Sequence, residues 1–318
     1  MALPITLTDV LKARRHVYRH LRPTPLFAYP SLDAATGLTL WVKHENHQPV
    51  GAFKVRGGVN LLANLSQAER ERGVVAVSTG NHGQSVAFAA RRFGARAIVF
   101  VPENANPVKL RAMELLGVEL RAVGKSYDEA RLAAEAFAEE SGMRYIHSGN
   151  EPLLIAGVGT YALEILEDLP ELEVLLVPVG GGSGAAGSAI VVKTLAPHVE
   201  VIGVQSEAAP AAYRSWKARR LESAPAKTRA EGLATGVGFE LPQQILWELL
   251  DDFVLVSDDE IDEAIRLYLE HTRNLAEGAG AAALAAAVRY RDRFQGRRVA
   301  VVLSGGNLSP DQLRAVLG

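Results

Sequence analysis

Short runs of aliphatic and β-branched residues alternate along this chain with longer segments that have helical periodicity. Apolar runs of this kind, bounded by glycine, proline or polar residues, are typical of strands that are buried on both faces. We expect such strands at 40–42, 74–77, 97–101, 174–177, 199–204 and 299–303. Because helical patterns separate most of these runs, the sequence predicts an α/β fold with two open, twisted, mainly parallel sheets flanked by helices.

The predicted strands form two groups, which is why we expect two sheets. The group between Val74 and Gly124 is compact in sequence, and the other group begins at Val174. Ligands of parallel sheets collect beyond the carboxyl ends of the strands. The segment that follows each strand is therefore where chemistry should be sought.

Composition narrows the classes of protein and partner. The chain has 318 residues, of which 48% are hydrophobic, so it can bury a sizeable core in one large or two ordinary domains. The net charge is −2 with both signs interspersed, which gives no electrostatic footprint for nucleic acid and no polybasic membrane patch. We expect small-molecule partners, no nucleic acid and no membrane.

The absence of cysteine has its own consequences. It excludes disulfides, thiolate metal sites and a cysteine nucleophile. The segment 1–15 lacks the apolar core of a secretory signal, and the apolar stretch 279–288 is too short to span a bilayer. We therefore expect a cytoplasmic protein.

Lys54 stands at the start of a predicted helix in the stretch 50–58, whose sequence is V-G-A-F-K-V-R-G-G. The helix is expected over 54–65 because apolar residues recur there at helical spacing. The amide groups of a first helical turn carry partial positive charge, which disfavours an ammonium ion and lowers its pKa. A lysine of this kind can form a Schiff base with a carbonyl compound. The alternative is an ordinary solvated surface lysine.

A polar loop follows the predicted strand at 74–77. The segment 78–84, with the sequence S-T-G-N-H-G-Q, is dense in hydroxyl, amide and glycine, and an apolar helix is expected directly after it over 85–93. Backbone N–H groups at such a helix N-terminus form a ready site for a carboxylate or a phosphate. The alternative is structural: serine and threonine cap the helix while Gly80 makes the turn.

A glycine-rich segment follows the predicted strand at 174–177. Its glycines, within 180–187, let the backbone approach an anion that the N–H groups of the next helix can hold, which predicts a phosphate cradle. Residues 182–187 also match G-x-G-x-x-G, so a nucleotide-binding oxidoreductase is the alternative. Two features count against it: the next strand ends in neutral Gln205, and the fingerprint does not lie in the first βαβ unit.

Ser304 follows the last predicted strand and precedes two glycines and Asn307. A hydroxyl at a strand end, followed by glycines, can face a ring or a phosphate without obstruction, although a plain turn is the alternative. Together, a lysine with a lowered pKa, a phosphate cradle, an anion-binding loop and a strand-end serine match the needs of pyridoxal phosphate.

Four motifs in register resemble the threonine dehydratase and serine racemase family of pyridoxal phosphate enzymes. They are Gly51 to Gly57, Ser78 to Gln84, Gly180 to Gly184 and Ser304 to Asn307, and the segments Arg22 to Leu26 and Ile155 to Thr160 match as well. The resemblance covers essentially the whole chain and implies the tryptophan synthase β-like fold. It implies a large cofactor-binding domain of 1–66 and 146–318, a small mobile domain of 67–145, and an active site in the cleft between them.

The resemblance assigns roles around the cofactor ring. Lys54 would form the Schiff base, and Phe53 would lie against the ring. Asn81 would bond the ring hydroxyl, and Ser304 would face the pyridine nitrogen. A serine there does not enforce a pyridinium as an aspartate would, which favours rapid loss of a β-leaving group.

The rest of the implied cofactor site comes mainly from glycines. The phosphate would be held by Gly180, Gly181, Gly182, Ser183 and Gly184. Gly232 and Glu277 also fall where family members line the cofactor. An exposed glutamate beside a helix start is an equally good interpretation of Glu277.

The resemblance places the substrate carboxylate on the polar loop after the strand at 74–77. Its implied ligands are Ser78, Thr79, Gly80, Asn81 and His82. Arg131 is a further candidate, because 127–131 resembles a substrate-arginine segment of the racemases. Threonine dehydratases of this family commonly have alanine at the position of Thr79, whereas serine racemases have a serine hydroxyl placed as a second acid or base. Thr79 is therefore a candidate catalytic residue and leaves racemisation open.

The implied reaction is β-elimination of water from L-threonine or L-serine, which gives 2-oxobutanoate or pyruvate and ammonia. Lys54 would take the α-proton once the substrate amine has displaced it. The alternatives within this chemistry are a serine racemase, a dehydratase of another β-hydroxy amino acid and a catalytically silent relative.

The resemblance implies no metal site. The racemases have carboxylates in their divalent-metal segment where this chain has Gln205 and Ala211, although Glu207 could act as a stray ligand. Because the chain ends at Gly318, we expect no C-terminal regulatory domain of the biosynthetic dehydratases. We also expect a homodimer or homotetramer.

Overall fold

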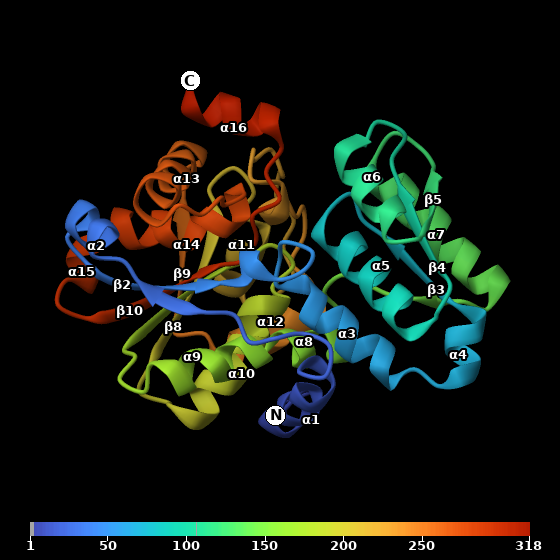
Figure 1. The fold of residues 1–318 in the computed structure, drawn as a ribbon, viewed down its shortest axis with the longest axis horizontal. Helices are drawn as coiled ribbons and strands as arrows, with labels where there is room; N and C mark the ends of the chain where they lie inside the picture. Colours follow the sequence, from blue (N-terminus) through green and yellow to red (C-terminus); the bar gives the residue numbers. More distant parts are fainter. Residues whose placement is uncertain (1–2, 106) are drawn as a thin grey trace.

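Two separate β-sheets, each with helices on both faces, make up the fold (Figure 1). The computed structural model describes residues 3–105 and 107–318. In spatial order, the larger sheet contains β1 (Leu26–Ala28), β2 (Thr39–His44), β10 (Arg298–Leu303), β7 (Val174–Pro178), β8 (Glu200–Ser206) and β9 (Asp252–Val256). In this sheet only β1 and β2 pair in the antiparallel direction.

The smaller sheet is parallel throughout. In spatial order, it contains β5 (Glu119–Ala122), β4 (Ala97–Val101), β3 (Val74–Val77) and β6 (Arg144–Tyr145). The predicted α/β class with two mainly parallel sheets is therefore confirmed.

All six predicted strand segments are strands in the structure, and the four further strands lie at sheet edges. β1 and β9 border the larger sheet, and β5 and β6 border the smaller one. β1, β5 and β6 are partly exposed, so the pattern of apolar runs buried on both faces does not mark them. β9 contains an apolar run at 253–256 and was missed all the same.

Helices cover both faces of the larger sheet (Figure 1). One face packs against helices that include α1 (Leu7–Val17), α8 (Pro152–Val158), α9 (Thr160–Asp168), α10 (Ser183–Leu195), α11 (Ala211–Ala218) and α12 (Glu240–Leu249). The other face packs against helices that include α2 (Pro30–Thr36), α13 (Asp258–Thr272), α14 (Gly278–Arg289), α15 (Arg291–Phe294) and α16 (Pro310–Leu317). η1 (Glu45–His47) and η2 (Glu231–Leu233) are short 3-10 helices.

Helix α14 is buried from Ala279 to Ala287 without an exposed stripe. Eight of these nine residues are alanine or glycine, so the helix can approach the sheet closely on one side and α13 on the other. A helix that is apolar all round is a core helix. Its first residue, Gly278, places the N-terminus of α14 beside the end of β10, where Glu277 N–H donates to the carbonyl oxygen of Gly305 at 3.1 Å.

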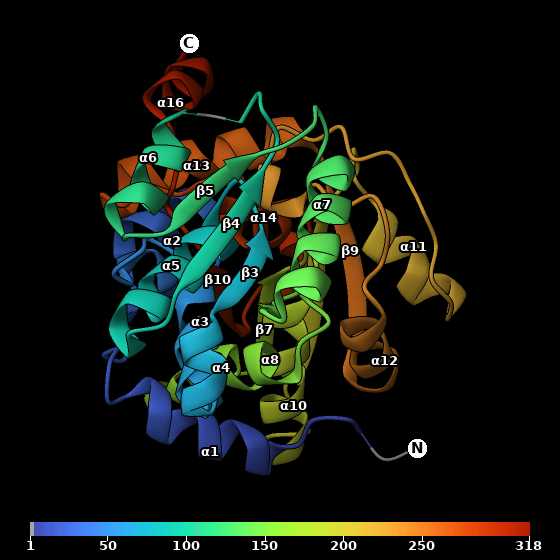
Figure 2. The ribbon, with the colours of Figure 1, turned by 90° about the vertical axis from the view of Figure 1, so that its right-hand side faces the viewer.

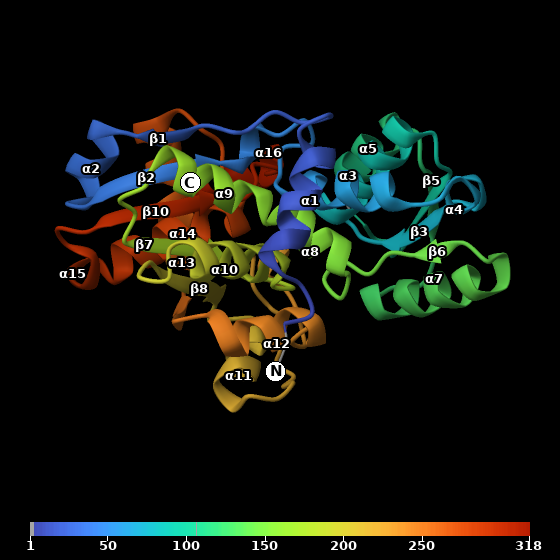
Figure 3. The same cartoon turned by 90° about the horizontal axis from the view of Figure 1, so that it is seen from below.

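The smaller sheet also has two covered faces. α5 (Asn81–Phe93) and α6 (Pro107–Leu115) lie on one face, and α7 (Tyr127–Ser141) lies on the other (Figures 2 and 3). α3 (Lys54–Asn64) lies between the two sheets, where it contacts α5 and α8, and α4 (Gln67–Arg72) leads on to β3. Of the described residues, no helix is long and apolar enough to cross a membrane.

The strands of the two sheets fall inside the predicted domain ranges. Those of the smaller sheet lie within 67–145, and those of the larger sheet lie within 1–66 and 146–318. The domain limits themselves and the mobility of the small domain stay predictions.

Candidate active site

Lys54 begins helix α3, and the end of β10 fixes the backbone in front of it. The N–H of Phe53 donates to the carbonyl oxygen of Ser304 at 3.0 Å, and Ala52 forms an antiparallel bridge with Gly305. The lysine motif and the strand-end serine motif, far apart in sequence, therefore meet at the first turn of α3.

The ε-amine of Lys54 has two hydrogen-bond partners. Nζ donates to the carbonyl oxygen of Ser148 and to Oγ of Ser183, each at 3.2 Å. It also lies 5.4 Å from the centroid of the Phe53 ring. Because Ser183 is the first residue of α10, the amine lies at the end of the predicted phosphate cradle.

Burial lowers the pKa of Lys54 to about 8. The direction of this shift agrees with the prediction from the sequence, which attributed it to the amide groups of the helix N-terminus. The structure assigns it to desolvation, which disfavours the charged form of any amine that leaves water. A neutral amine is consequently accessible near neutral pH, as a nucleophile or a base requires.

Two consecutive glycines let α3 approach its neighbours closely. A Cβ at Gly57 would lie 2.9 Å from the carbonyl oxygen of Leu154 in α8. A Cβ at Gly58 would overlap Oγ of Ser85 in α5. With no side chain there, Ser85 Oγ donates to the carbonyl oxygen of Lys54 at 2.7 Å. α8, which packs on the larger sheet, and α5, which packs on the smaller sheet, therefore both contact the backbone around Lys54.

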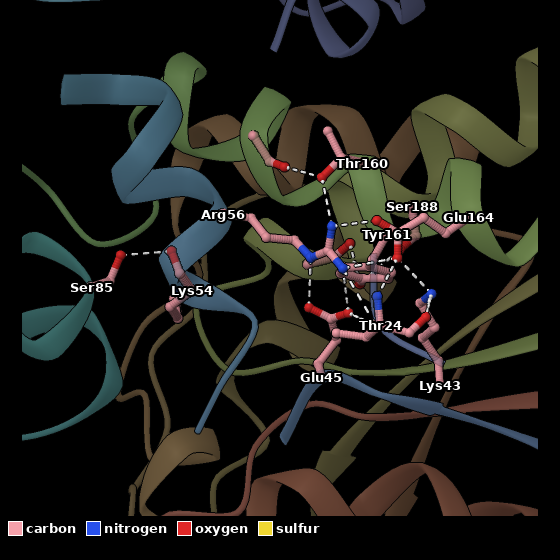
Figure 4. Close-up of polar contacts among 12 residues, drawn as sticks. Thr24, Lys43, Glu45, Lys54, Arg56, Ser85, Thr160, Tyr161, Glu164 and Ser188 are labelled. Carbon is pink, nitrogen blue, oxygen red and sulfur yellow. Dashed lines mark hydrogen bonds and ion pairs between the residues drawn. The ribbon is translucent and has the colours of Figure 1, made fainter. Parts of the chain in front are cut away.

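Arg56 lies two residues beyond Lys54 at the centre of a buried charge network (Figure 4). Its guanidinium donates twice to Glu45, at 2.7 and 2.8 Å, and twice to Glu164, at 2.6 and 2.9 Å. Lys43 Nζ pairs with Glu164 at 2.6 Å. Burial disfavours the Arg56 cation, but the two carboxylates hold its pKa above the ordinary value. The network balances two cations against two anions and anchors α3.

Helix α5 begins at Asn81, so the predicted start at Ser85 is wrong. Gly80 precedes the helix, and its carbonyl oxygen accepts the N–H of Gln84 at 3.2 Å. The prediction placed the start where the apolar periodicity begins, but the first turn consists of polar residues. First-turn N–H groups have no acceptor within their own helix, which suits an anion. The anion site in this loop stays a prediction.

Asn81 links this loop to segments that pack on the larger sheet. Its Nδ2 donates to Oε1 of Glu277 at 2.6 Å, and its Oδ1 accepts from Nδ2 of Asn307 at 2.7 Å. Burial raises the pKa of Glu277, and the bond from Asn81 opposes that rise. Glu277 directly precedes α14, as the alternative interpretation required, but it is not an exposed side chain. The structure brings the predicted residues Asn81 and Glu277 together.

The glycine loop between β7 and α10 is shaped by close contacts. Gly182 has φ +90°, in the left-handed region that favours glycine. A Cβ at Gly181 would lie 2.5 Å from Cε2 of Phe239, and a Cβ at Gly180 would overlap the carbonyl oxygen of Gly232. The N–H groups of the first turn of α10 have no acceptor within their own helix, which suits an anion.

The arrangement fits pyridoxal phosphate. The aldehyde and phosphate arms of this cofactor stand on neighbouring ring carbons, and here the Lys54 amine lies 3.2 Å from Ser183 Oγ at the start of the anion cradle. The Phe53 ring approaches Gly184, where a Cβ would lie 3.2 Å from its Cε2. Ser304 is buried at the end of β10, next to the lysine motif.

Three residues that were predicted to bind the substrate are His82, Arg131 and Thr79, and the first two have hydrogen-bond partners elsewhere in the protein. His82 Nε2–H donates to the carbonyl oxygen of Ile146 at 3.2 Å, and burial lowers its pKa to about 3. Arg131 donates to both carboxylate oxygens of Glu135, at 2.9 and 3.0 Å, on its own helix. Thr79 is partly exposed in the loop before α5. The substrate roles of these residues stay predictions.

In the segment where the racemases have their divalent-metal site, the side chains of this chain are neutral or paired. Gln205 Oε1 accepts the N–H of Tyr213 at 3.0 Å, and its Nε2 donates to Thr235 Oγ1 at 3.4 Å. Glu207 pairs with Arg289 at 2.6 Å. Within 3–105 and 107–318, no group of three or more histidine, aspartate or glutamate residues is placed to hold a metal ion.

Sequence reasoning missed two features of the site. The turn 147–150 supplies the carbonyl oxygen of Ser148 to Lys54, and a backbone contact leaves no residue-type signal in the sequence. The partners of Arg56 were also missed, because Glu164 is 108 positions away. The K-V-R spacing places both side chains on the first turn of α3, but only the fold reveals their partners.

Known proteins are similar to this chain in sequence and fold. Residues 17–305 match the family model described as "Pyridoxal-phosphate dependent enzyme". The L-threonine ammonia-lyase of Thermotoga maritima is 40% identical over 316 residues, which cover 98% of this chain and 78% of that protein.

Solved structures give the same picture. The processed form of threonine deaminase isoform 2 from Solanum lycopersicum is similar with a TM-score of 0.93 and 33% identity, over 98% of this chain and 91% of that chain. The serine racemase of Dictyostelium discoideum is similar with a TM-score of 0.90 and 31% identity, over 96% of this chain and 99% of that chain.

Proposed function

The chain belongs to the family of pyridoxal-phosphate dependent enzymes, and we propose that it eliminates water from L-threonine and L-serine, after which hydrolysis of the released amine gives 2-oxobutanoate or pyruvate and ammonia. The observation that carries this proposal is the Lys54 amine, whose pKa is lowered to about 8 by burial and which lies 3.2 Å from Ser183 at the anion cradle. The similarity to an L-threonine ammonia-lyase supports the choice of substrate.

The start of α3 and the segments after three strands supply most of the residues that would hold the cofactor. Lys54 would bind its aldehyde carbon, the first-turn N–H groups of α10 would bind its phosphate, and Phe53 would lie against its ring. The further contacts would come from Asn81, Gly180, Gly181, Gly182, Ser183, Gly184, Gly232, Glu277 and Ser304. Pyridoxal phosphate supplies an electron sink for the bond pair that is released at the substrate α-carbon.

Lys54 Nζ is the proposed base. In its neutral form it takes the proton from the substrate α-carbon. The carbonyl oxygen of Ser148 and Oγ of Ser183 then hold the resulting ammonium at the positions where they now contact the amine. The C–O bond at the β-carbon breaks, and the hydroxyl leaves as water with a proton that the cofactor phosphate would supply. The unsaturated amine that is released takes up water to give the 2-oxo acid and ammonia.

The loop before α5 would orient the substrate. The substrate carboxylate would bind to the N–H groups of the first turn of α5 and to the side chains of Ser78 and Asn81. Thr79, Gly80 and His82 complete this proposed carboxylate site. Arg131 would join only by leaving Glu135, with which it is now paired.

Racemisation of serine is a second candidate function. The similarity to a serine racemase favours it, and so does the Thr79 hydroxyl in the loop before α5. Racemisation needs a proton donor on the substrate face opposite Lys54, and Thr79 is the residue that we propose for it. A β-branched side chain has few χ1 states, so this hydroxyl is held either on the substrate or away from it.

We further propose a homodimer or homotetramer that works in the cytoplasm, with a small domain of 67–145 that moves as a unit. Large apolar side chains, among them Phe27 and Leu132, are exposed on the single chain, and a subunit interface would cover such area. Light scattering of the purified protein gives the oligomeric state, and scattering with and without L-serine reports closure of the small domain.

The test of the proposed function uses the purified protein supplied with pyridoxal phosphate. We expect 2-oxo acid and ammonia in equal amounts from L-threonine and L-serine, and a borohydride-fixed cofactor label on the peptide that contains Lys54. Other β-hydroxy amino acids in the same panel rank the substrate preference. A label on another lysine, or no 2-oxo acid from any amino acid in the panel, would falsify the proposal.

A further inference from the structure

His147 organises the turn that follows β6. Its ring Nδ1 accepts two backbone hydrogen bonds, from the N–H of Gly149 at 3.0 Å and from the N–H of Asn150 at 2.9 Å. A ring nitrogen that accepts carries no proton, so the neutral ring has its proton on Nε2. Two N–H groups that converge on one acceptor fix the conformation of the turn 147–150.

This turn directs a carbonyl oxygen at Lys54. Ser148 lies between His147 and the two donors, and its carbonyl oxygen accepts from Nζ of Lys54 at 3.2 Å. A carbonyl oxygen only accepts hydrogen bonds, and Nζ has an N–H to donate both as a neutral amine and as an ammonium ion. This hydrogen bond can therefore form in either protonation state of Lys54. The position of the His147 ring is therefore linked through one peptide group to the position of the Lys54 amine.

The same turn touches the glycine loop. The His147 ring lies edge-on to Phe239, with ring centroids 4.9 Å apart. Phe239 in turn covers Gly181, where a Cβ would be 2.5 Å from its Cε2. Asn150 Oδ1 accepts the N–H of Leu241 at 3.1 Å, which joins the turn to the start of α12. The turn is thus supported on the side of the anion cradle as well.

We propose that His147 is a positioning residue for Lys54: its neutral ring holds the Ser148 carbonyl on the lysine amine, and protonation of Nδ1 releases the turn. The proposal rests on the proposed function, in which Lys54 Nζ takes the α-proton. A protonated Nδ1 donates, so it cannot accept from Gly149 and Asn150, and both N–H groups lose their partner.

Burial and two nearby cations keep the ring of His147 neutral. Burial is the largest cause that lowers its pKa, and Lys54 and Arg131 lower it further. The groups that face the ring are Glu135 and Arg131 of α7, Lys54 of α3, His82 of α5 and Glu151 before α8. The two carboxylates oppose the shift without reversing it. Because the folded pKa lies below the ordinary value of about 6.5, the ring becomes charged only in more acidic solution.

Three variants separate the roles of the ring. His147→Asn keeps an acceptor that can reach the same two N–H groups, as in an Asx turn, but it does not titrate. His147→Phe keeps an aromatic ring against Phe239 and has no acceptor. His198→Asn, at an exposed histidine outside the site, is the matched control.

Two readouts are measured, one of them without the cofactor. The first is kcat and KM for L-threonine between pH 5 and pH 9. The second is the rate at which Lys54 of the cofactor-free protein is acylated, followed by mass spectrometry. We expect kcat of His147→Phe to fall about 10- to 100-fold at all pH values with little change in KM, because the reacting amine is misplaced. Its Lys54 acylation rate should change as well.

Protonation of Lys54 gives every variant a loss of kcat in acid. In the wild type kcat should fall more steeply than this loss alone predicts, because the His147 ring also becomes charged, whereas His147→Asn should recover most of kcat and keep only the Lys54 limb. Wild-type values of both readouts in His147→Phe would overturn the proposal. An acid limb as steep in His147→Asn as in the wild type would also overturn it, even if the phenylalanine variant fails to fold. If no variant and no wild type releases 2-oxo acid, the proposed function fails, and Lys54 acylation still decides whether His147 positions the amine.

Discussion

Arg56 and Glu164 are joined inside the protein by two hydrogen bonds, of 2.6 Å from Nη1 to Oε1 and 2.9 Å from Nη2 to Oε2. Arg56 is wholly buried and Glu164 is 4% exposed, so neither charge is screened by water. The pair connects the first turn of α3, which carries Lys54, to α9 of the larger sheet unit. The stability of the fold and the position of the reactive amine therefore depend on the same buried contact.

Replacing Arg56 should destabilise the protein strongly. Arg56→Met leaves the buried carboxylates of Glu45 and Glu164 with too few partners, which costs about 3–5 kcal/mol of unfolding free energy. Arg56→Lys keeps the charge but loses the paired geometry, so we expect a smaller loss. Urea unfolding measures both changes.

The matched control is the exposed pair of Arg96 and Glu119, joined at 2.8 Å. Arg96→Met should cost less than about 1 kcal/mol, as is usual for surface ion pairs. Equal losses for Arg56→Met and Arg96→Met would contradict the view that the buried network stabilises the fold.

Removal of the Lys54 amine should abolish turnover. Lys54→Ala loses both the cofactor-binding amine and the proposed base, so kcat/KM should fall by at least about 10²- to 10⁴-fold. Lys12→Ala, at an exposed lysine, should leave it unchanged. Retention of a sizeable share of activity by Lys54→Ala would show that another group takes the proton.

The lowered pKa of Lys54 has a measurable pH dependence in the cofactor-free protein. Only the neutral amine reacts with an acylating reagent, so its rate should rise about tenfold per pH unit below pH 8 and level off above it. The rate at an ordinary exposed lysine keeps rising to about pH 10.4. Peptide mass spectrometry at a series of pH values compares Lys54 with Lys12, and parallel curves would disprove the shift.

Thr79→Ala should separate elimination from racemisation. We expect the wild type to form D-serine slowly beside pyruvate, and the alanine variant to form none while it still dehydrates L-threonine. Chiral analysis of the serine left after partial turnover measures this directly. If the wild type forms no D-serine, Thr79 has no second role, and if the variant racemises as before, another residue is the acid.

Chelation should leave activity and stability nearly unchanged. Gln205 is hydrogen-bonded to Tyr213, and Glu207 is paired with Arg289, so these side chains offer no set of free carboxylates to a divalent ion. Activity and melting temperature before and after treatment with a chelator check this expectation. A loss that magnesium or calcium reverses would reveal a cation site elsewhere.

Local patterns in the sequence were sufficient for the inner strands, for the start of α3 at Lys54 and for the glycine loop. A strand buried on both faces needs a continuous apolar run, and a backbone with positive φ, as at Gly182, favours glycine. The start of α5 was misplaced because its first turn, from Asn81, is polar and belongs to the site instead of the core.

The sequence by itself determined the two-sheet α/β class, the lysine and the segments that follow the strands, because these follow from short-range periodicity and turn chemistry. Only the tertiary structure decided why the Lys54 pKa is low, which carboxylates pair with Arg56 and which carbonyl oxygen His147 directs at the amine. Desolvation and the pairing of charges depend on which distant segments converge, and no local pattern records that convergence.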